Sequence, residues 1–261
     1  MVEKNPQADE SVNELYGALR SKHGEGNSKA NGYLWHGYFV REQKLLFSIL
    51  DSHASQERAQ LDATENKSAQ SQFSRNGKVL LDVGCGSGLM CSPLVANRRI
   101  VAGLDFNEAA CLDAKTNGIE VIRGDAFGLP IGSDTVDEIV TCQFFNQQSA
   151  LAVSRFVEES ARVLRPGGRV IMIWRNGEAL VHRLALAAFR LLERIRDVPR
   201  FPYENHAIAG LVAEGRKYQL EAEYSAVSFP PCSWLSEDTG TLAAKIIGAS
   251  NICVLRKPTN E

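Results

Sequence analysis

The stretch VLLDVGCGSG, residues 79–88, is the part of the sequence that predicts the fold most strongly. Its first half is aliphatic apart from Asp82, as in a short buried strand, and glycines follow at alternate positions, Gly84, Gly86 and Gly88. Glycine adopts positive φ without a Cβ clash, so the backbone can turn tightly there and approach a ligand closely. Residues 89–97 are expected to form a helix whose amide-rich start lies beside this turn. A strand, a glycine-rich turn and a helix in this order predict a nucleotide-cofactor site in an α/β sheet.

The residues after this turn alternate between short apolar runs and amphipathic stretches. Strands are expected at 100–105, 119–123, 136–142 and 169–174, and helices at 107–116 and 149–164. Strands that alternate with helices imply right-handed crossovers and a mostly parallel sheet covered on both faces. The C-terminal part departs from this alternation, with helices expected at 178–196, 206–214 and 237–248 and strands at 218–229 and 251–256. We therefore predict an α/β fold with a Rossmann-like, doubly wound, mostly parallel sheet, an antiparallel C-terminal edge strand and three α/β/α layers.

Residues 1–77 differ in composition from the rest of the chain and are expected to form an N-terminal arm, a lid helix and a linker. The helix is expected at 40–51, and the polar stretch 52–77 is expected to be a linker or a weakly anchored helix. An aromatic and histidine patch precedes the helix and consists of Tyr33, Trp35, His36 and Tyr38. These side chains either pack the helix on the sheet or belong to the lid. Residues 78–261 are the expected core domain, with a helical insertion at roughly 178–216.

The overall composition limits the partners that this chain can have. With 261 residues, 44% of them hydrophobic, the chain can bury one sizeable core. The formal net charge of −2 gives no electrostatic reason to expect a nucleic acid partner. The apolar runs are far shorter than a bilayer span, so no integral membrane contact is expected, and the polar first residues favour a cytoplasmic protein. The six cysteines show no CxxC spacing, so no metal site is expected.

The glycine-rich turn alone does not identify the cofactor. A dinucleotide fingerprint requires G-x-G-x-x-G or a closing Ala, but its third position here is Leu89. A dinucleotide-binding strand would also carry an apolar residue where Asp82 stands. Asp105, near the end of the second strand, fits a ribose-binding carboxylate in either class of protein. Asp82 and Leu89 therefore argue against NAD, and an NAD-dependent oxidoreductase stays as the less favoured alternative.

Four segments, in order, resemble the motifs of class I S-adenosylmethionine-dependent methyltransferases. They are residues 79–88, the acidic motif GLDFN at 103–107, the segment GDAFGLP at 124–130 with DTVD at 134–137, and the turn VLRPGGRV at 163–170. The likeness extends from residue 78 to residue 174 and is closest to the small-molecule branch, methyltransferase type 11, which contains quinone-biosynthesis enzymes. It implies S-adenosyl-L-methionine as cofactor, S-adenosyl-L-homocysteine as product and a small-molecule acceptor that is methylated on O, N or C.

The resemblance also implies roles for individual residues. Asp105 would accept hydrogen bonds from the ribose hydroxyls, and Asp125 would accept one from the adenine amino group. The backbone N–H of Ala126 would donate to the adenine ring. Phe106 and Phe127 are placed either to pack on the adenine faces or to join the core. Asp82 can order the loop and offset the cationic end of the cofactor. The expected cofactor-binding residues are Asp82, Gly84, Cys85, Gly86, Gly88, Asp105, Phe106, Asp125, Ala126, Phe127 and Gln143.

Residues 143–148, after the fourth strand, are expected to face the transferred methyl group and the acceptor. Gln143 is the expected contact to the methionine moiety, and Phe144 and Phe145 are expected to shape the acceptor side. The acceptor-side or lid candidates are Tyr33, Trp35, His36, Tyr38, Phe144 and Gln148. Methyl transfer depends mainly on alignment and exclusion of water, so no catalytic residue is assigned, and His182 and His206 are expected to be solvated. A protein that binds S-adenosylmethionine without turnover is the main alternative.

Residues 180–195 mix apolar side chains with arginines, among them Arg183 and Arg190. A basic amphipathic helix can lie on a membrane surface, cap the acceptor pocket or form the contact between two copies in a homodimer. The sequence leaves these three interpretations open.

Overall fold

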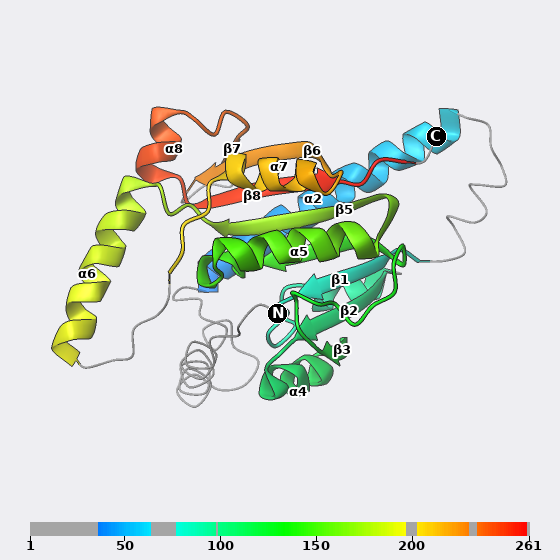
Figure 1. The fold of residues 1–261 in the computed structure, drawn as a ribbon, viewed down its shortest axis with the longest axis horizontal. Coiled ribbons are helices and arrows are strands. Elements are labelled where there is room, and N and C mark those ends of the chain that lie inside the picture. Colours follow the sequence, from blue (N-terminus) through cyan, green and yellow to red (C-terminus); the bar gives the residue numbers. More distant parts are fainter. Residues whose placement is uncertain (1–35, 64–76, 98, 197–202, 230–233, 260–261) are drawn as a thin grey trace.

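The computed structural model describes residues 36–63, 77–97, 99–196, 203–229 and 234–259, which form an eight-stranded sheet with helices packed against it (Figure 1). The strands are β1 (Val79–Val83), β2 (Ile100–Asp105), β3 (Glu120–Arg123), β4 (Val136–Cys142), β5 (Leu164–Arg175), β6 (Glu221–Phe229), β7 (Trp234–Ser236) and β8 (Ser250–Arg256). The helices are α2 (His36–Ala63), α4 (Glu108–Thr116), α5 (Ala150–Val163), α6 (Leu180–Arg196), α7 (Ile208–Lys217) and α8 (Leu242–Ile247), with 3₁₀ helices η2 (Ser92–Asn97) and η3 (Phe145–Gln147).

The strands lie in the order β3-β2-β1-β4-β5-β8-β6-β7. The first five of these are parallel, β8 is antiparallel to both β5 and β6, and β7 is antiparallel to β6. The predicted fold class is confirmed. The antiparallel strand at the edge is β7, whereas the C-terminal strand β8 lies inside the sheet. β8 suits an interior position because its first six residues are all buried, which requires cover on both faces.

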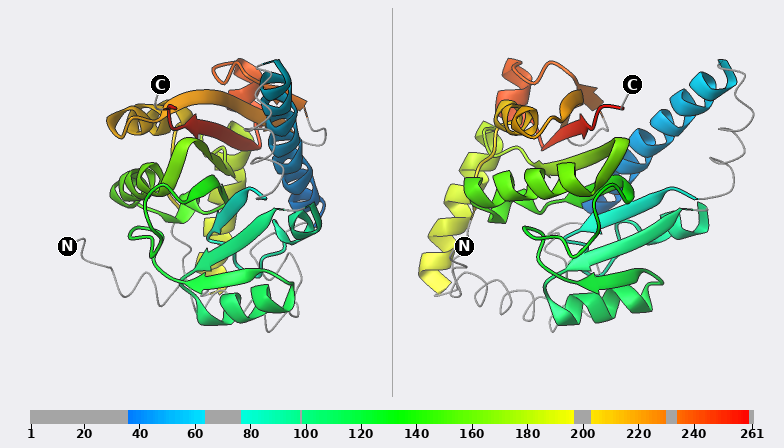
Figure 2. Two further views of the ribbon diagram at one scale, coloured as in Figure 1. Left: turned by 90° about the vertical axis from the view of Figure 1, so that its right-hand side faces the viewer. Right: turned by 45° about the vertical axis from the view of Figure 1, so that its right-hand side comes forward.

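Each face of the sheet carries its own apolar core, with α2 on one side and α5 with α7 on the other (Figure 2). Successive residues of β5 point to opposite faces, as the pleat requires, so Ile171 joins the core under α2 while Met172 joins the core under α5. Leu46 and Leu50 of α2 fill the first core, and Phe156 of α5 fills the second. The result is the predicted three-layer arrangement.

The segment after the glycine-rich turn differs from the prediction. Instead of an α-helix over 89–97, the chain makes turns and then the 3₁₀ helix η2. The physical reason is Pro93, which has no N–H to donate to the carbonyl of Leu89. That carbonyl instead accepts a hydrogen bond from Nε2 of Gln43 at 2.8 Å, and the carbonyl of Met90 accepts from the same nitrogen at 3.1 Å.

The N-terminal helix is longer than predicted. α2 runs from His36 to Ala63, so it continues into the first part of 52–77, the stretch expected to be a linker or a weakly anchored helix. Its apolar side chains recur at helical spacing and belong to the core of the sheet: Phe39, Leu45, Leu46, Ile49 and Leu50. The helix is therefore held by burial over its first half.

A buried ion cluster lies near the start of β4, at the end opposite the glycine-rich turn. The carboxylate of Glu138 pairs with the guanidinium groups of Arg99 and Arg169, and Nζ of Lys78 lies 3.8 Å from Oε1 of Glu138. Glu138 and Arg169 are almost fully buried. Charges removed from water in this way depend on their partners, so the cluster ties β4 to β5 and to the segment before β2.

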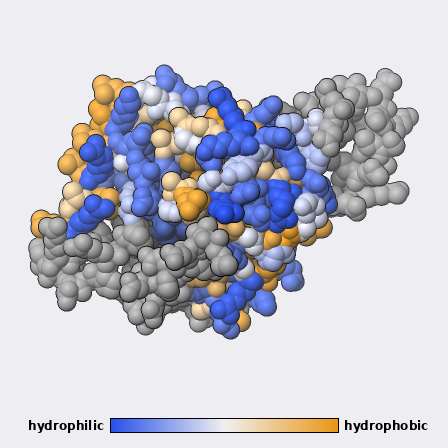
Figure 3. All heavy atoms as spheres, in the orientation of Figure 1, coloured by the Kyte–Doolittle hydropathy of each residue, from blue (hydrophilic) through white to orange (hydrophobic). Residues whose placement is uncertain are grey.

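Helix α6 runs down the side of the molecule at which the parallel strands end (Figure 1). Exposed apolar side chains lie on it and on the neighbouring α8 (Figure 3): Leu180, Val181, Leu184, Leu191, Leu242, Ile246 and Ile247. Arg183 and Arg190 are also exposed, so α6 has the amphipathic, basic character that the sequence predicts. Within the described residues, no helix is long and apolar enough to cross a membrane.

Candidate functional site

The glycine turn, residues 84–88, joins β1 to the segment before η2. Gly84, Gly86 and Gly88 all have positive φ, at 72°, 55° and 74°. A Cβ at Gly84 would lie 2.8 Å from Cδ2 of Phe144, so a side chain there would collide with the segment after β4. The amides of Gly84 and Cys85 both donate to the carbonyl of Leu104, which fixes the turn against β2. The turn thus presents backbone to the carboxyl end of the sheet, as glycine at these positions predicts.

The side chain of Cys85 does not point into this site. Its Sγ packs toward Gly103 of β2, where a Cβ would lie 2.7 Å away, and the residue is buried. Burial, together with the nearby Asp82 and Asp105, raises the pKa of the Cys85 thiol far above its ordinary range. Cys85 is therefore a small, unreactive residue that contributes only its backbone to the turn.

Asp105 joins the glycine turn to the end of β2. Its Oδ2 accepts a hydrogen bond from the amide of Gly86 and its Oδ1 accepts one from the amide of Asn107, both at 2.9 Å. Asn107 in turn caps α4, as predicted, by accepting from the amide of Ala110. The amides of Gly86 and Asn107 fix the orientation of the Asp105 carboxylate at the edge of the sheet. Phe106 follows with its side chain 45% exposed beside this carboxylate.

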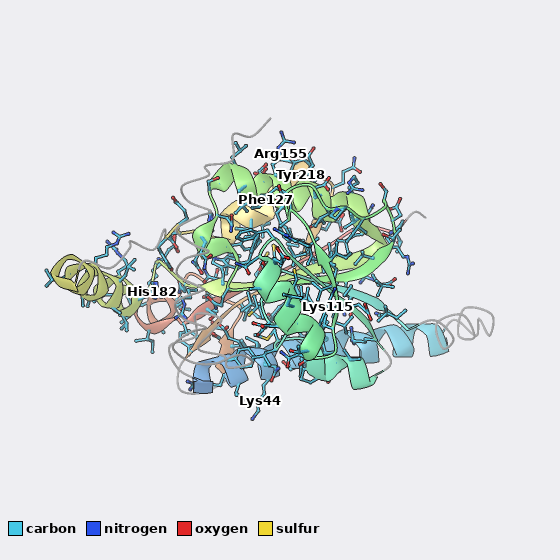
Figure 4. All side chains as sticks on the ribbon, turned by 90° about the horizontal axis from the view of Figure 1, so that it is seen from below. Lys44, Lys115, Phe127, Arg155, His182 and Tyr218 are labelled. Atoms are coloured by element: carbon cyan, nitrogen blue, oxygen red, sulfur yellow. The ribbon has the colours of Figure 1, made fainter. Side chains whose placement is uncertain are left out.

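The third acidic residue follows β3 on the same edge of the sheet. Oδ1 of Asp125 accepts from the amide of Phe127 at 3.0 Å, which closes a local turn around the buried Ala126. The ring of Phe127 is half-buried and lies 6.0 Å from the ring of Phe144, on the α5 side of the sheet (Figure 4). Asp125, Phe127 and Phe144 are therefore brought to one side of the glycine turn.

Three buried oxygen atoms near the ends of β1 and β4 have no hydrogen-bond partner among the described residues. They are Oδ2 of Asp82, Oγ1 of Thr141 and Oε1 of Gln143. Asp82 lies opposite Val140, whose side chain joins the core under α2, so Asp82 is on the α2 side of the sheet like Gln143, whereas Thr141 points to the core under α5. Buried polar atoms without partners are unfavourable by about 1–3 kcal/mol each, so such a group indicates a place where a ligand supplies donors.

Burial also determines the charge state of Asp82. The side chain is 2% exposed, and desolvation, reinforced by the charge of Asp105, raises its pKa to about 7 despite a hydrogen bond from Cys91. A positively charged ligand nearby would favour the ionised form and reverse this penalty. The chemistry of the site therefore suits a cationic group next to Asp82.

Gln143 is held in an uncommon conformation by a residue that the sequence did not single out. Its φ is 59°, a left-handed value that costs a non-glycine residue energy and often marks functional sites. Its Nε2 donates to Oε1 of Glu42 at 2.5 Å, and the same carboxylate accepts from Oγ of Ser250 at 2.7 Å and from Sγ of Cys142 at 3.5 Å. Because Nε2 of Gln143 faces the carboxylate of Glu42, Oε1 of Gln143 points away from Glu42.

Glu42 and Gln43 thus connect α2 to both halves of the site. Gln43 binds the two carbonyls after the glycine turn, and Glu42 binds the ends of β4 and β8. A signal for Glu42 was present in the sequence, because a charged residue three positions after Phe39 falls on the apolar face of the helix. Glu42 is 3% exposed, so this carboxylate is buried and fully committed to hydrogen bonds.

The segment after β4 divides between site and core. Phe144 packs on Gly84, as a site residue would, whereas Phe145 is fully buried against Phe156 and Trp174. The expectation that Phe145 shapes the acceptor side is therefore wrong, since its ring faces the core under α5. The half-buried Gln148 contributes its backbone carbonyl, which lies 2.9 Å from Nε2 of His206.

His206 is the second correction. It was expected to be solvated but is buried, because its carbonyl accepts from Nε1 of Trp174 at 2.8 Å and its ring packs edge-on against Phe145. His182 is half-buried rather than solvated. Of the predicted lid residues, Tyr33 and Trp35 lie outside the described residues, and for His36 and Tyr38 the structure describes the backbone in α2 but not the side chains.

Comparison with known proteins shows what this chain is similar to. Residues 81–172 match a family described as methyltransferase domain. The matched residues run from β1 to β5, so the similarity covers the parallel half of the sheet and the glycine turn. A ubiquinone biosynthesis O-methyltransferase from Rhizobium johnstonii is 29% identical over 194 residues, which cover 67% of this chain and 75% of that protein. A probable S-adenosylmethionine-dependent methyltransferase from Mycolicibacterium smegmatis is 35% identical over 94 residues.

The similar proteins are matched over different shares of their length. The Mycolicibacterium match covers 35% of this chain and 36% of that relative, so it spans well under two thirds of its length. A crystal structure of an S-adenosylmethionine-dependent methyltransferase from Methanosarcina mazei superposes with a TM-score of 0.57 at 19% identity, covering 71% of this chain and 95% of that one. At this identity the superposition shows a shared fold, and it agrees with the sheet order described above.

Proposed function

We propose that this protein transfers a methyl group from S-adenosylmethionine to a small-molecule acceptor. The observation that carries the proposal is a pair of buried oxygen atoms near the glycine turn, Oδ2 of Asp82 and Oε1 of Gln143, which have no hydrogen-bond partner among the residues that the structure describes. Oxygen acceptors and a buried carboxyl suit a ligand with an ammonium and a sulfonium group. When bound, S-adenosylmethionine supplies a methyl group on a cationic sulfur, which leaves as a neutral thioether.

The residues around the turn can hold the rest of this cofactor. Asp105 would accept hydrogen bonds from the ribose hydroxyls, with its carboxylate oriented by the amides of Gly86 and Asn107. Asp125 and the amide of Ala126 would bind the edge of the adenine ring, between Phe106 and Phe127. Gln143 and Asp82 would accept hydrogen bonds from the amino group at the amino acid end of the cofactor. The remaining task of the protein is alignment of the acceptor and exclusion of water.

The same features speak against an NAD-dependent oxidoreductase. A pyrophosphate carries negative charge and is bound by amides at the start of an α-helix. Here η2 is a short 3₁₀ helix that begins four residues after the turn, and the acidic residues Asp82, Asp105 and Asp125 surround the site. Placing a pyrophosphate among these carboxyl groups would be electrostatically unfavourable.

A small-molecule acceptor is favoured over a nucleic acid because the net charge is −2, and the similarity to an enzyme named for ubiquinone biosynthesis is consistent with it. The test is calorimetric binding of S-adenosylhomocysteine compared with NADH, followed by transfer of labelled methyl groups to a panel of acceptors. Binding of NADH without binding of S-adenosylhomocysteine would refute the proposal. Tight cofactor binding with no transfer to any acceptor would instead favour a binding protein without turnover.

A further inference from the structure

Helix α6 presents an apolar stripe on its exposed side. Leu180, Leu184 and Leu191 follow one another at helical spacing on one side of the helix, and all three are exposed. At a rise of 1.5 Å per residue this stripe is about 16 Å long. The half-buried His182 and Leu186 lie on the opposite side of the helix. A surface helix normally turns its apolar side toward the protein and its polar side toward water, so the exposed side of α6 has the wrong polarity for contact with water alone.

Helix α8 adds exposed apolar side chains beside the start of α6 (Figures 1 and 2). The two helices contact each other, and Nδ2 of Asn176, just before α6, donates to the carbonyl of Ala244 in α8 at 3.0 Å. The exposed apolar side chains of the two helices together are called the α6–α8 face: Leu180, Leu184, Leu191, Leu242, Ile246 and Ile247. Apolar side chains gathered in this way on a protein surface indicate a docking site.

The exposed cations next to these apolar side chains have no counter-charge. Arg183 and Arg190 lie seven residues apart, on the same side of the α6 stripe, and Lys245 lies on α8. None of these three cations forms an ion pair in the part of the chain that the structure describes, whereas the exposed Arg123 and Lys217 of other elements pair with acids. Every charged side chain that the structure describes on α6 and α8 is therefore positive.

These charges select among the surfaces that could cover the α6–α8 face. The net charge of the chain is −2, so attraction to a negatively charged surface must come from such a local group of cations. The acids nearest in sequence, Glu178 and Glu237, precede the two helices. Two-fold contact with a second copy would place like patch against like patch and bring the unpaired cations of both copies together. Cations beside an apolar helix face are instead typical of helices that lie in the headgroup region of an anionic bilayer.

We propose that the α6–α8 face docks on the surface of a membrane that contains anionic phospholipids. The leucine stripe of α6 enters the boundary between headgroups and acyl chains, and Arg183 and Arg190 pair with lipid phosphates. α6 lies in the plane of the membrane surface and does not cross it. Because α6 follows β5 at the side where the parallel strands end, docking brings that side of the sheet beside the lipid (Figure 1). This inference goes beyond the proposed function and does not depend on it.

The test is co-sedimentation of the full chain with vesicles of phosphatidylcholine or of phosphatidylcholine mixed equally with phosphatidylglycerol. We expect binding at least about tenfold tighter to the mixed vesicles, since each cation at an anionic surface strengthens binding about fivefold. Leu184→Glu with Leu191→Glu weakens binding at least about 30-fold, because two apolar side chains no longer enter the lipid. The matched control is Leu112→Glu with Leu151→Glu, at leucines of α4 and α5 with nearly the same exposure, and it changes binding less than about twofold.

The contribution of charge is measured with a second pair of variants. Arg183→Gln with Arg190→Gln lowers binding to the mixed vesicles at least about tenfold and leaves binding to phosphatidylcholine within about twofold. Lys115→Gln with Arg216→Gln removes two exposed cations from α4 and α7, so the net charge changes by the same amount, and it keeps the preference for phosphatidylglycerol. All four substitutions are at exposed positions, so the unfolding temperature should stay the same.

Three results would overturn the inference. They are equal binding to both kinds of vesicle, no binding to either, and an equal loss of binding in the α6 variants and their matched controls. A dimer seen by analytical ultracentrifugation without vesicle binding, and removed by Leu184→Glu with Leu191→Glu, would also overturn it and assign the face to a second copy. A protein that binds vesicles but not S-adenosylhomocysteine would instead refute the proposed function and leave this inference standing.

Discussion

Replacing Glu42 tests whether α2 helps to bind the amino acid end of the cofactor. Glu42→Ala removes the acceptor of Nε2 of Gln143 and of Oγ of Ser250. The amide of Gln143 is then free to rotate, and its Oε1 is no longer directed to the site. Loss of one hydrogen bond to a charged ammonium group weakens the binding free energy by about 1.5–3 kcal/mol, which corresponds to about a 10- to 150-fold increase in Kd.

The assay compares two ligands that differ only at the end in question. S-adenosylhomocysteine carries the amino acid group, whereas 5′-methylthioadenosine keeps the nucleoside and lacks that group. We expect Glu42→Ala to weaken binding of the first ligand by the stated factor and to leave binding of the second within about twofold, because Asp105 and Asp125 are untouched. Isothermal titration calorimetry measures both.

Two further variants separate positioning from stability. Glu42→Gln keeps an oxygen that can accept from Gln143, so most of the affinity should return, while Asp51→Ala removes an exposed acid of the same helix and should change neither ligand. Glu42→Ala also removes the acceptor of Nε2 of Gln143 and of the buried Oγ of Ser250, and should lower the free energy of unfolding by about 2–6 kcal/mol. Equal weakening of both ligands, or no weakening of either, would refute the assignment of Glu42 to this role.

Three other predictions concern acidic residues at different places in the fold. Asp105→Ala should weaken binding of both S-adenosylhomocysteine and 5′-methylthioadenosine by about 1.5–3 kcal/mol, with the exposed Glu120→Ala as control; unchanged calorimetric affinity in a folded variant would remove Asp105 from the site. Because burial raises the pKa of Asp82 from 3.8 to about 7, the stability that the protonated carboxyl contributes below pH 4 is lost as pH rises toward 7, by about 4 kcal/mol at most. Asp82→Asn should therefore flatten the fall in Tm between pH 4 and pH 8 in the ligand-free protein, and an identical pH profile in both proteins would contradict this. Glu138→Ala should lower the free energy of unfolding by about 3–5 kcal/mol in urea titrations while leaving cofactor affinity unchanged, since it removes the carboxylate that pairs with Arg99 and Arg169 at the far end of β4; a loss below about 1 kcal/mol would mean that the cluster is not stabilising.

The parallel half of the sheet could be predicted from short segments of the sequence. The aliphatic runs of β1, β2, β4 and β5 are short and nearly continuous, which is typical of parallel strands covered on both faces. The glycine turn followed from residue type alone, because Gly84, Gly86 and Gly88 all need positive φ. Asp105 and Asp125 followed from their place at the ends of strands that must share one edge.

Only the tertiary structure decided which side chains complete the site. Glu42 lies 101 positions before Gln143 and 208 before Ser250, and no local pattern predicts contacts at that separation. Likewise, Phe144 and Phe145 are neighbours of the same type, and only packing against α5 sends the second into the core. The sequence by itself determined the fold, the turn and the acids at the strand ends, because short-range sterics and the pattern of apolar runs specify them. The contacts of Glu42 and the burial of His206 depend on which distant segments meet, and that was decided by the packed core.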